Sequence, residues 1–400
     1  MIRKTLLYFL AATCVSNTFA NSVFSLTFGP PLIVSNSLIF AESNVSALSR
    51  RIICINRYGR RLWDIERDEG YVQVWFSISN SVIVTTATDI LLVNADSGTI
   101  AKSHNGHFQN SCVRKFAGTS VLICHDKEGV NTLSCLEMNS GKFVWQIKNI
   151  TRVIDDGSNI VLCKFVDRGD VGANNHNYVK RKLCAIKGDD GGLLWDYPLE
   201  ASFGSDDDLD GGRVGNYFIV ANSGNILCFE DSTGKIVSHR QIDPSLVPRM
   251  SLFIKDRIAL LWFPLAARIS TTNYPTLSRI TIPDLSINGV LSVDDSTFMK
   301  VVFFSDAAVV CRSIGWTKAY NCQTGELRWN GGQWNCGGVS DGWLYFSEAE
   351  YFGKRSSIKR VNILTGRIEK IYEEERRDIV NGNDISTNDV NSVRPQIPDI

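Results

Sequence analysis

The most constraining feature of the sequence is a motif that recurs along most of the chain. Each copy has a short apolar strand, a polar turn that ends in glycine, and a second short strand that often closes with tryptophan. The copies are IICINRYGRRLW (52–63), LLVNADSGTIAK (91–102), LSCLEMNSGKFVW (133–145), LCAIKGDDGGLLW (183–195), ILCFEDSTGKIVS (226–238), AYNCQTGELRW (319–329) and IKRVNILTGRIEK (358–370). Such a series predicts one large fold built from similar β units rather than several independent domains.

The spacing of the motif predicts how many units there are. The turn glycines are Gly59, Gly98, Gly141, Gly191, Gly234, Gly325 and Gly366. The interval from 234 to 325 is about twice the others, and LSRITIPDLSING (277–289) lies where a decayed unit belongs. With that unit included, the glycines recur about every 44 residues, which is the spacing of four-stranded propeller blades. Because alternating apolar residues also precede each copy, as in SVIVTTATD (81–89), we predict an all-β, eight-bladed β-propeller of four-stranded antiparallel blades.

The residues that recur among the copies of the motif have structural explanations. Glycine permits the positive φ angle that such a turn requires, and Asp, Asn or Ser before it can bond to the turn backbone. The tryptophans that follow four residues after a turn glycine can cover their own blade and the adjoining one; they are Trp63, Trp145, Trp195 and Trp329. We therefore assign these residues to stability rather than to chemistry.

The two ends of the chain differ from the repeats. Residues 1–20 have a basic start, an apolar stretch and a small-residue exit at Ala20, which is the layout of a secretory signal. We predict a signal peptide over 1–20, the propeller over 21–372 and a polar, disordered tail over 373–400. The mature protein is then expected in the periplasm, and Cys14 leaves open whether a lipid is attached.

Composition excludes one class of partner. Lys+Arg and Asp+Glu are equal at 42 each, and the sequence has no long basic run. A nucleic-acid-binding protein needs a cationic surface for the phosphate backbone. We therefore expect no nucleic-acid partner.

The full form of the motif, as in CLEMNSGKFVW (135–145) and AYNCQTGELRW (319–329), resembles the repeat of pyrroloquinoline-quinone (PQQ)-type propellers. The resemblance covers about residues 29–372. One class of that family, the quinoprotein dehydrogenases, holds PQQ beneath a disulfide between adjacent cysteines, together with calcium. This sequence has no adjacent cysteine pair.

The other class resembled is the BamB-type propeller, a non-enzymatic scaffold in the assembly of outer-membrane β-barrel proteins. The resemblance implies no cofactor, no metal and no enzymatic activity. It also implies a monomer that contacts the outer membrane through a protein partner, the barrel-assembly complex. Two alternatives stay open: a PQQ- and calcium-dependent quinoprotein dehydrogenase, and a propeller that binds a small ligand.

One acidic segment is the candidate partner-binding site. It is SDDDLDGG (205–212), with Asp206, Asp207, Asp208 and Asp210, and BamB-type proteins carry an acidic loop in a similar place. The segment also begins like a calcium loop, but its twelfth position is Tyr217 rather than an acid, so we favour a solvated acidic turn. His104 and His107 lie near each other without a third ligand nearby in the sequence.

The cysteines allow two interpretations. Cys54, Cys135, Cys184 and Cys228 occupy the small-residue position of the motif, where a buried thiol packs as a small apolar group. An oxidising compartment would instead favour pairing. Three pairs could face each other across hairpins: Cys124–Cys135, Cys311–Cys322 and Cys163–Cys184.

Overall fold

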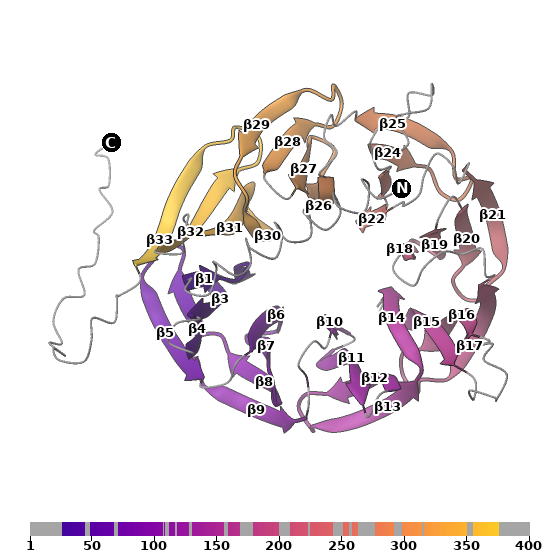
Figure 1. Ribbon diagram of the computed structural model, residues 1–400, viewed down its shortest axis with the longest axis horizontal. Coiled ribbons are helices and arrows are strands. Elements are labelled where there is room, and N and C mark those ends of the chain that lie inside the picture. Colours follow the sequence, from indigo (N-terminus) through magenta and orange to yellow (C-terminus); the bar gives the residue numbers. More distant parts are fainter. Residues whose placement is uncertain are drawn as a thin grey trace, which may run out of the picture.

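The computed structural model forms a ring of eight antiparallel sheets, which confirms the predicted propeller (Figure 1). It describes residues 26–44, 49–67, 71–106, 108, 112–116, 118–127, 130–155, 159–168, 179–199, 209–222, 225–242, 251–255, 258–262, 277–291, 298–313, 316–349 and 355–375. Each sheet is one blade, numbered here from the N-terminus. Strands in a blade pair with their sequence neighbours, except that β1 of blade 1 pairs with β3.

The strands of the first four blades are as follows. Blade 1 has β1 (Leu26–Phe28), β2 (Leu32–Val34), β3 (Ser37–Asn44), β4 (Ser49–Asn56) and β5 (Arg61–Arg67). Blade 2 has β6 (Val72–Ile78), β7 (Ser81–Thr86), β8 (Asp89–Asn94) and β9 (Ile100–Asn105). Blade 3 has β10 (Cys112–Lys115), β11 (Ser120–Lys127), β12 (Val130–Glu137) and β13 (Lys142–Lys148). Blade 4 has β14 (Ile150–Asp155), β15 (Ile160–Arg168), β16 (Val179–Lys187) and β17 (Leu193–Leu199).

The other four blades follow the same plan. Blade 5 has β18 (Asp210–Val214), β19 (Tyr217–Asn222), β20 (Asn225–Glu230) and β21 (Ile236–Gln241). Blade 6 has β22 (Ser251–Lys255), β23 (Ile258–Trp262), β24 (Leu277–Ile280) and β25 (Ile287–Leu291). Blade 7 has β26 (Phe298–Phe304), β27 (Ala308–Ser313), β28 (Thr317–Asn321) and β29 (Leu327–Gly331). Blade 8 has β30 (Asn335–Ser340), β31 (Trp343–Ala349), β32 (Arg355–Asn362) and β33 (Ile368–Glu375).

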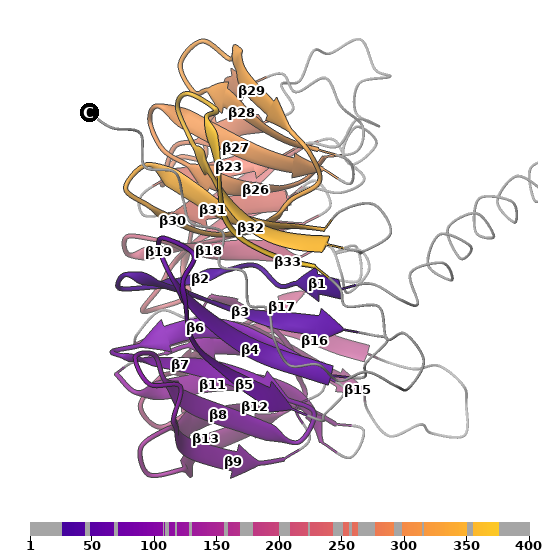
Figure 2. The ribbon, with the colours of Figure 1, turned by 90° about the vertical axis from the view of Figure 1, so that its left-hand side faces the viewer.

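The ends of the described ring bear on the predicted boundaries. The strand β33 continues to Glu375, past the predicted propeller end at residue 372. Residues 1–25, which include the predicted signal peptide, and residues 376–400 lie outside the described ranges. Seen from the side, the sheets of neighbouring blades lie one above another around the ring (Figure 2).

The apolar core lies between blades rather than within one centre. Among the described residues it divides into clusters that each join two neighbouring blades. The cluster between blades 5 and 6, for example, contains Ile219 and Cys228 from one blade and Leu261 from the next, all fully buried. The middle strands are buried on both faces by these clusters, which explains their nearly continuous apolar sequences.

Tryptophans hold four of the blade junctions. Trp195 of β17 donates its indole N–H to the carbonyl oxygen of Asp231 in blade 5 at 2.8 Å, and its ring covers Gly234. A Cβ atom at Gly234 would stand 2.5 Å from that ring. The contact recurs for Trp63 on Gly98, Trp145 on Gly191 and Trp329 on Gly366, with indole bonds of 2.9, 2.8 and 2.8 Å to the carbonyls of Ala95, Gly188 and Ile363. The glycine and the tryptophan of the motif thus form one contact between neighbouring blades, called here the indole–glycine contact.

The decayed unit of the sequence is blade 6. At its junction with blade 5, other contacts take the place of the indole–glycine contact. Leu285 has φ of 57° and its N–H donates to the carbonyl oxygen of Thr281 at 2.9 Å, as Gly234 does to Glu230. The Leu285 side chain is fully buried at the junction with blade 5. Blade 5 has Ser238 instead of tryptophan, and this serine donates to the carbonyl oxygen of Pro283. The smaller residue on blade 5 leaves the space that the leucine side chain fills.

Candidate functional site

The inner strands surround a central cavity of about 770 Å³. Its lining comes from the first strands of blades 3 to 8, which lie innermost in the ring (Figure 1), and from Leu260 of β23. The lining residues fall into two groups. Blades 3, 4 and 5 contribute the charged residues, which are Arg114, Arg152, Asp210 and Arg213. Blades 6, 7 and 8 contribute apolar residues, which include Phe253, Ile254, Val301, Val302, Phe303 and Val339.

Ion pairs order the charged side of the cavity. Arg152 of β14 donates to Asp210 of β18 at 2.6 Å, which joins blades 4 and 5. Arg213 of β18 pairs with Asp231, whose side chain is only 8% exposed. Arg152 itself keeps 37% of its side chain exposed. The Arg152 side chain is therefore held in place by Asp210 and is still partly exposed.

The predicted acidic site is only partly described. Asp206, Asp207 and Asp208 lie outside the described residues. Asp210 lies within the cavity lining and is paired with Arg152. Asp210 is therefore an ion-paired residue of strand β18 and not part of a solvated turn.

Sequence reasoning did not identify the cavity arginines. A signal was present, because arginine occurs in the first strand of three successive blades, at Arg114, Arg152 and Arg213. The first strands of blades 6 and 7 instead read SLFIK (251–255) and FMKVVFF (298–304). Comparing equivalent strands across the repeats would have shown that arginine is absent from blades 6 and 7, whose strands have larger apolar residues and one lysine each.

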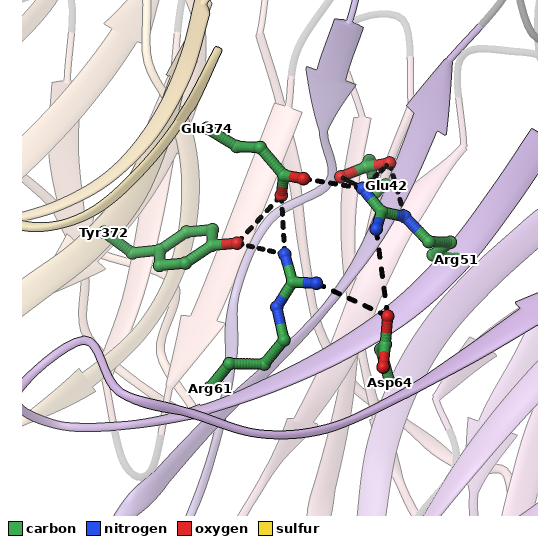
Figure 3. A network of polar contacts seen from close by, with 6 residues as sticks. All are labelled: Glu42, Arg51, Arg61, Asp64, Tyr372 and Glu374. Atoms are coloured by element: carbon green, nitrogen blue, oxygen red, sulfur yellow. Dashed lines mark hydrogen bonds and ion pairs between the residues drawn. The ribbon is translucent and has the colours of Figure 1, made fainter. Parts of the chain in front are cut away.

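A second polar cluster closes the ring between blades 8 and 1 (Figure 3). Arg51 of β4 donates from Nε and Nη2 to the two carboxylate oxygens of Glu42 at 2.9 and 2.8 Å, and from Nη2 to Glu374 of β33 at 2.7 Å. Arg61 of β5 donates to the other Glu374 oxygen at 2.8 Å and also to the hydroxyl of Tyr372. Asp64 lies 3.7 and 3.4 Å from Arg51 and Arg61. We call these six residues the closing network.

The two glutamates of the network have pKa shifts of opposite direction. Glu42 is 1% exposed, and burial together with the nearby Glu374 charge raises its pKa to about 7. Burial also acts to raise the pKa of Glu374, but hydrogen bonds and charge from Arg51, with Tyr372 and Arg61, outweigh it and lower that pKa. At neutral pH the network therefore holds one ionised glutamate and one that is close to its titration point.

The raised pKa of Glu42 predicts a pH-dependent stability. The carboxyl titrates near 4.5 when unfolded and near 7 when folded, so the folded protein binds more protons between these values. Its contribution to stability is complete below about pH 4.5 and is lost as pH rises through about 7. We expect Glu42→Gln, which mimics the protonated acid, to unfold like wild type at pH 5 and at a temperature a few degrees higher at pH 8.

Thermal unfolding measured from pH 5 to pH 8 tests this expectation. The control is Glu326→Gln, which changes an exposed glutamate of the blade 7 turn and should leave the wild-type slope intact. A wild-type slope in Glu42→Gln would contradict the assignment.

The cysteines whose side chains the structure describes are free thiols: Cys54, Cys124, Cys135, Cys163, Cys184, Cys228, Cys311, Cys322 and Cys336. Burial raises the pKa of the Cys54, Cys135 and Cys184 thiols to about 11. Such thiols are protonated at neutral pH and are weak nucleophiles. As free thiols, these buried cysteines pack as small apolar groups.

The strand register bears on the three candidate disulfides. Cys163 lies directly opposite Cys184 between β15 and β16. Cys124 and Cys135 are offset, because Cys124 faces Leu133 and Cys135 faces Leu122. Cys311 faces Lys318. The disulfide pairings stay predictions.

Histidine has a packing role at one junction. His104 of β9 takes the place of tryptophan, because a Cβ atom at Gly141 of blade 3 would stand 2.3 Å from its ring. His107 lies outside the described residues. Within the described ranges, no group of three or more His, Cys, Asp or Glu side chains is arranged to hold a metal ion. In the same part of the chain, no helix is long and apolar enough to cross a membrane.

Comparison with known proteins supports the PQQ-like repeat found in the sequence. A family model described as "Outer membrane protein assembly factor BamB" matches residues 129–252, which lie in blades 3 to 6. No curated protein matches the sequence.

Solved structures share the fold at low sequence identity. BamB from Moraxella catarrhalis is similar at a TM-score of 0.53 and 14% identity, over 79% of this chain and 89% of that one. The computationally designed Ika8 protein is similar at a TM-score of 0.53 and 15% identity, over 87% of this chain and 96% of that one. The dihydro-heme d1 dehydrogenase NirN is similar at a TM-score of 0.51 and 10% identity, over 88% of this chain and 73% of that one. Since BamB, a designed protein and a dehydrogenase all share this fold, these matches establish architecture and not activity. Together with the family model, they confirm that the chain is an eight-bladed propeller of PQQ-like repeats that resembles the BamB-type family.

Proposed function

We propose that this protein is a non-enzymatic, exported, protein-binding scaffold that assists the assembly of outer-membrane β-barrel proteins. The observation that carries the proposal is the family match over residues 129–252, described for an outer membrane protein assembly factor. The match spans the junctions of blades 3 to 6 and includes the acidic segment 205–212. The partner is then the barrel-assembly complex, and membrane association follows from that partner.

The outer strands of the ring support a role in protein binding. An exposed apolar residue recurs shortly after the turn glycine, near the start of the outermost strand. The exposed fractions are 46% for Leu62, 41% for Ile100, 51% for Val144, 59% for Leu193, 45% for Val237, 53% for Leu327 and 48% for Ile368. Each outermost strand also pairs on one side only within its sheet. An extended partner segment can use such an edge by strand addition, with apolar side chains giving complementarity.

Affinity capture of the tagged full-length protein from native envelopes tests the proposal. We expect the barrel-assembly complex to be recovered with the wild type. We expect the variant Asp206→Asn/Asp207→Asn/Asp208→Asn to recover several-fold less, since these acids form the proposed contact; Asp210 is left unchanged because it pairs with Arg152.

The matched control is Asp306→Asn, which neutralises an exposed acid in the β26–β27 turn. It should recover the complex as the wild type does. Failure of the wild-type protein to recover barrel-assembly components would refute the proposed role. Equal recovery by the triple variant and the control would refute the acidic segment as the contact.

A further inference from the structure

A small pocket lies between blades 8 and 1, which are neighbours in the closed ring (Figure 1). Its volume is about 180 Å³. Residues of the β2–β3 and β4–β5 turns line it from blade 1, and residues of the β30–β31 turn line it from blade 8. The N–H of Gly338 in β30 donates to the carbonyl oxygen of Pro31, just before β2, at 3.2 Å. The blades that form the pocket are therefore joined by a backbone hydrogen bond.

Part of the pocket surface is apolar. It comes from Ile33, Leu38, Trp343 and Tyr345, which pack in one cluster between the two blades. Leu38 and Tyr345 are only 2% and 6% exposed, so the pocket reaches the core of this junction. The guanidinium carbon of Arg360 lies 4.5 Å from the centre of the Trp343 ring. A ligand with an apolar body would cover this surface, which is favourable in water.

Two residues of opposite charge line the same pocket without an ion-pair partner. Arg57 of the β4–β5 turn donates from Nη2 to the side-chain oxygen of Asn36, a neutral group, at 2.5 Å. Asp341 of the β30–β31 turn accepts a hydrogen bond from the hydroxyl of Ser340 at 3.1 Å. Within the described part of the chain, Arg57 and Asp341 form no ion pair with each other or with a third residue.

The third charged residue of the described lining is already neutralised. Arg360 donates from Nε and Nη2 to one carboxylate oxygen of Glu369 at 2.8 and 2.6 Å. The charges left for a ligand are thus one guanidinium from blade 1 and one carboxylate from blade 8. The planar guanidinium matches a carboxylate, and an aspartate accepts hydrogen bonds from an ammonium group. A zwitterion satisfies both groups at once.

We propose that this pocket binds a small zwitterion with an apolar body, of the class of the apolar α-amino acids. Its carboxylate pairs with Arg57, its ammonium group pairs with Asp341, and its side chain lies against Leu38 and Trp343. The volume of about 180 Å³ is below the roughly 300 to 1,000 Å³ of sites for drug-sized molecules, so the ligand is smaller than those. The site is separate from the proposed scaffold contacts, which lie on the outer strands and in segment 205–212.

Isothermal titration calorimetry of the full-length protein with L-leucine tests the site. We expect saturable binding of one molecule per protein. Two analogues of leucine each lack one charge: 3-methylbutylamine has no carboxylate, and 4-methylpentanoate has no ammonium group. Each analogue should bind at least about tenfold more weakly, because it leaves Arg57 or Asp341 without its charged partner.

Two charge variants should lose selectivity against different analogues. Arg57→Gln removes the partner of the carboxylate, so it should no longer bind L-leucine better than 3-methylbutylamine. Asp341→Asn removes the partner of the ammonium group, so it should no longer bind L-leucine better than 4-methylpentanoate. Asparagine suits position 341, where φ is 52°, because it tolerates the left-handed region. Partial unfolding cannot produce this crossed pattern, and circular dichroism would also detect it.

The matched controls are Arg60→Gln and Asp306→Asn. Arg60 is an exposed arginine of the same turn as Arg57 but is not part of the described pocket lining, and Asp306 is an exposed acid in the equivalent turn of blade 7. Both variants should bind L-leucine and its analogues like the wild type. Unchanged selectivity in either Arg57→Gln or Asp341→Asn would overturn the proposal. Absence of saturable binding of L-leucine, L-valine and L-methionine to the wild type would overturn it as well.

Discussion

Gly234→Ala should lower the free energy of unfolding by about 3 kcal/mol, which is a large loss for one methyl group. The new Cβ atom would stand 2.5 Å from the Trp195 ring, and that ring is held by its bond to Asp231. Overpacking of a rigid contact costs roughly 1–3 kcal/mol. The φ angle of +70° at this position adds about 1 kcal/mol for any residue with a Cβ atom. Thermal unfolding followed by circular dichroism measures the loss.

The control for this variant is Gly215→Ala. Gly215 has φ of +60° but nothing within 4 Å of its would-be Cβ atom, so only the backbone cost of about 1 kcal/mol is expected. A double-mutant cycle with Trp195→Ala isolates the contact. The loss of stability in the double variant should be smaller than the sum of the losses in the two single variants, because removing the indole makes room for the methyl group. Additive losses, or equal losses at 215 and 234, would contradict the indole–glycine contact.

Arg51→Met should lower the free energy of unfolding by about 3 kcal/mol at pH 8. Arg51 bonds to Glu42, which is 1% exposed, and to Glu374 on the last strand of the ring. Removing one partner of a buried ionic network leaves uncompensated charge, with costs of roughly 3–5 kcal/mol. Methionine keeps a similar length of apolar side chain, so the loss reports the charge and not the packing. The midpoint of chemical unfolding measures it.

The same substitution at Arg367 provides the control. Arg367 is exposed and pairs with Glu369 at 3.1 Å, and such surface pairs contribute about 0–1 kcal/mol. The Arg51→Met loss should also shrink at pH 5, where Glu42 is protonated in the folded protein. A loss at pH 5 equal to that at pH 8 would argue against a charge-based closing network.

The ring itself could be predicted from the sequence because its evidence is local. Each motif encodes a strand, a glycine turn and a strand within about a dozen residues, so hairpins such as β20–β21 follow directly. Blade 6 was harder to recognise, since Leu285 stands where the other units have glycine. Its compensation by Ser238 crosses a blade junction, with the bonded Pro283 lying 45 positions away. Aligning the repeats shows which residue each blade has at a position, but not that Ser238 of blade 5 contacts Pro283 of blade 6.

The candidate sites depended on contacts that the sequence does not display. Arg51 and Glu374 are 323 positions apart, and only closure of the ring brings them together. Asp210 belongs to an acidic run in the sequence, yet its partner Arg152 lies 58 positions earlier. Fold follows from local periodicity here, whereas the charge balance of a site follows from which strands become neighbours.

The replacement at the junction of blades 5 and 6 shows how such a ring can diverge. At this junction a large residue on the turn meets a small one on the preceding outer strand, the reverse of the Trp195–Gly234 order. Either change alone leaves a clash or a void, so blades cannot accumulate substitutions independently at these positions. The turn residue of one blade and the facing residue on the outer strand of the preceding blade must therefore be complementary in size, so a substitution at one of these positions requires a matching change at the other.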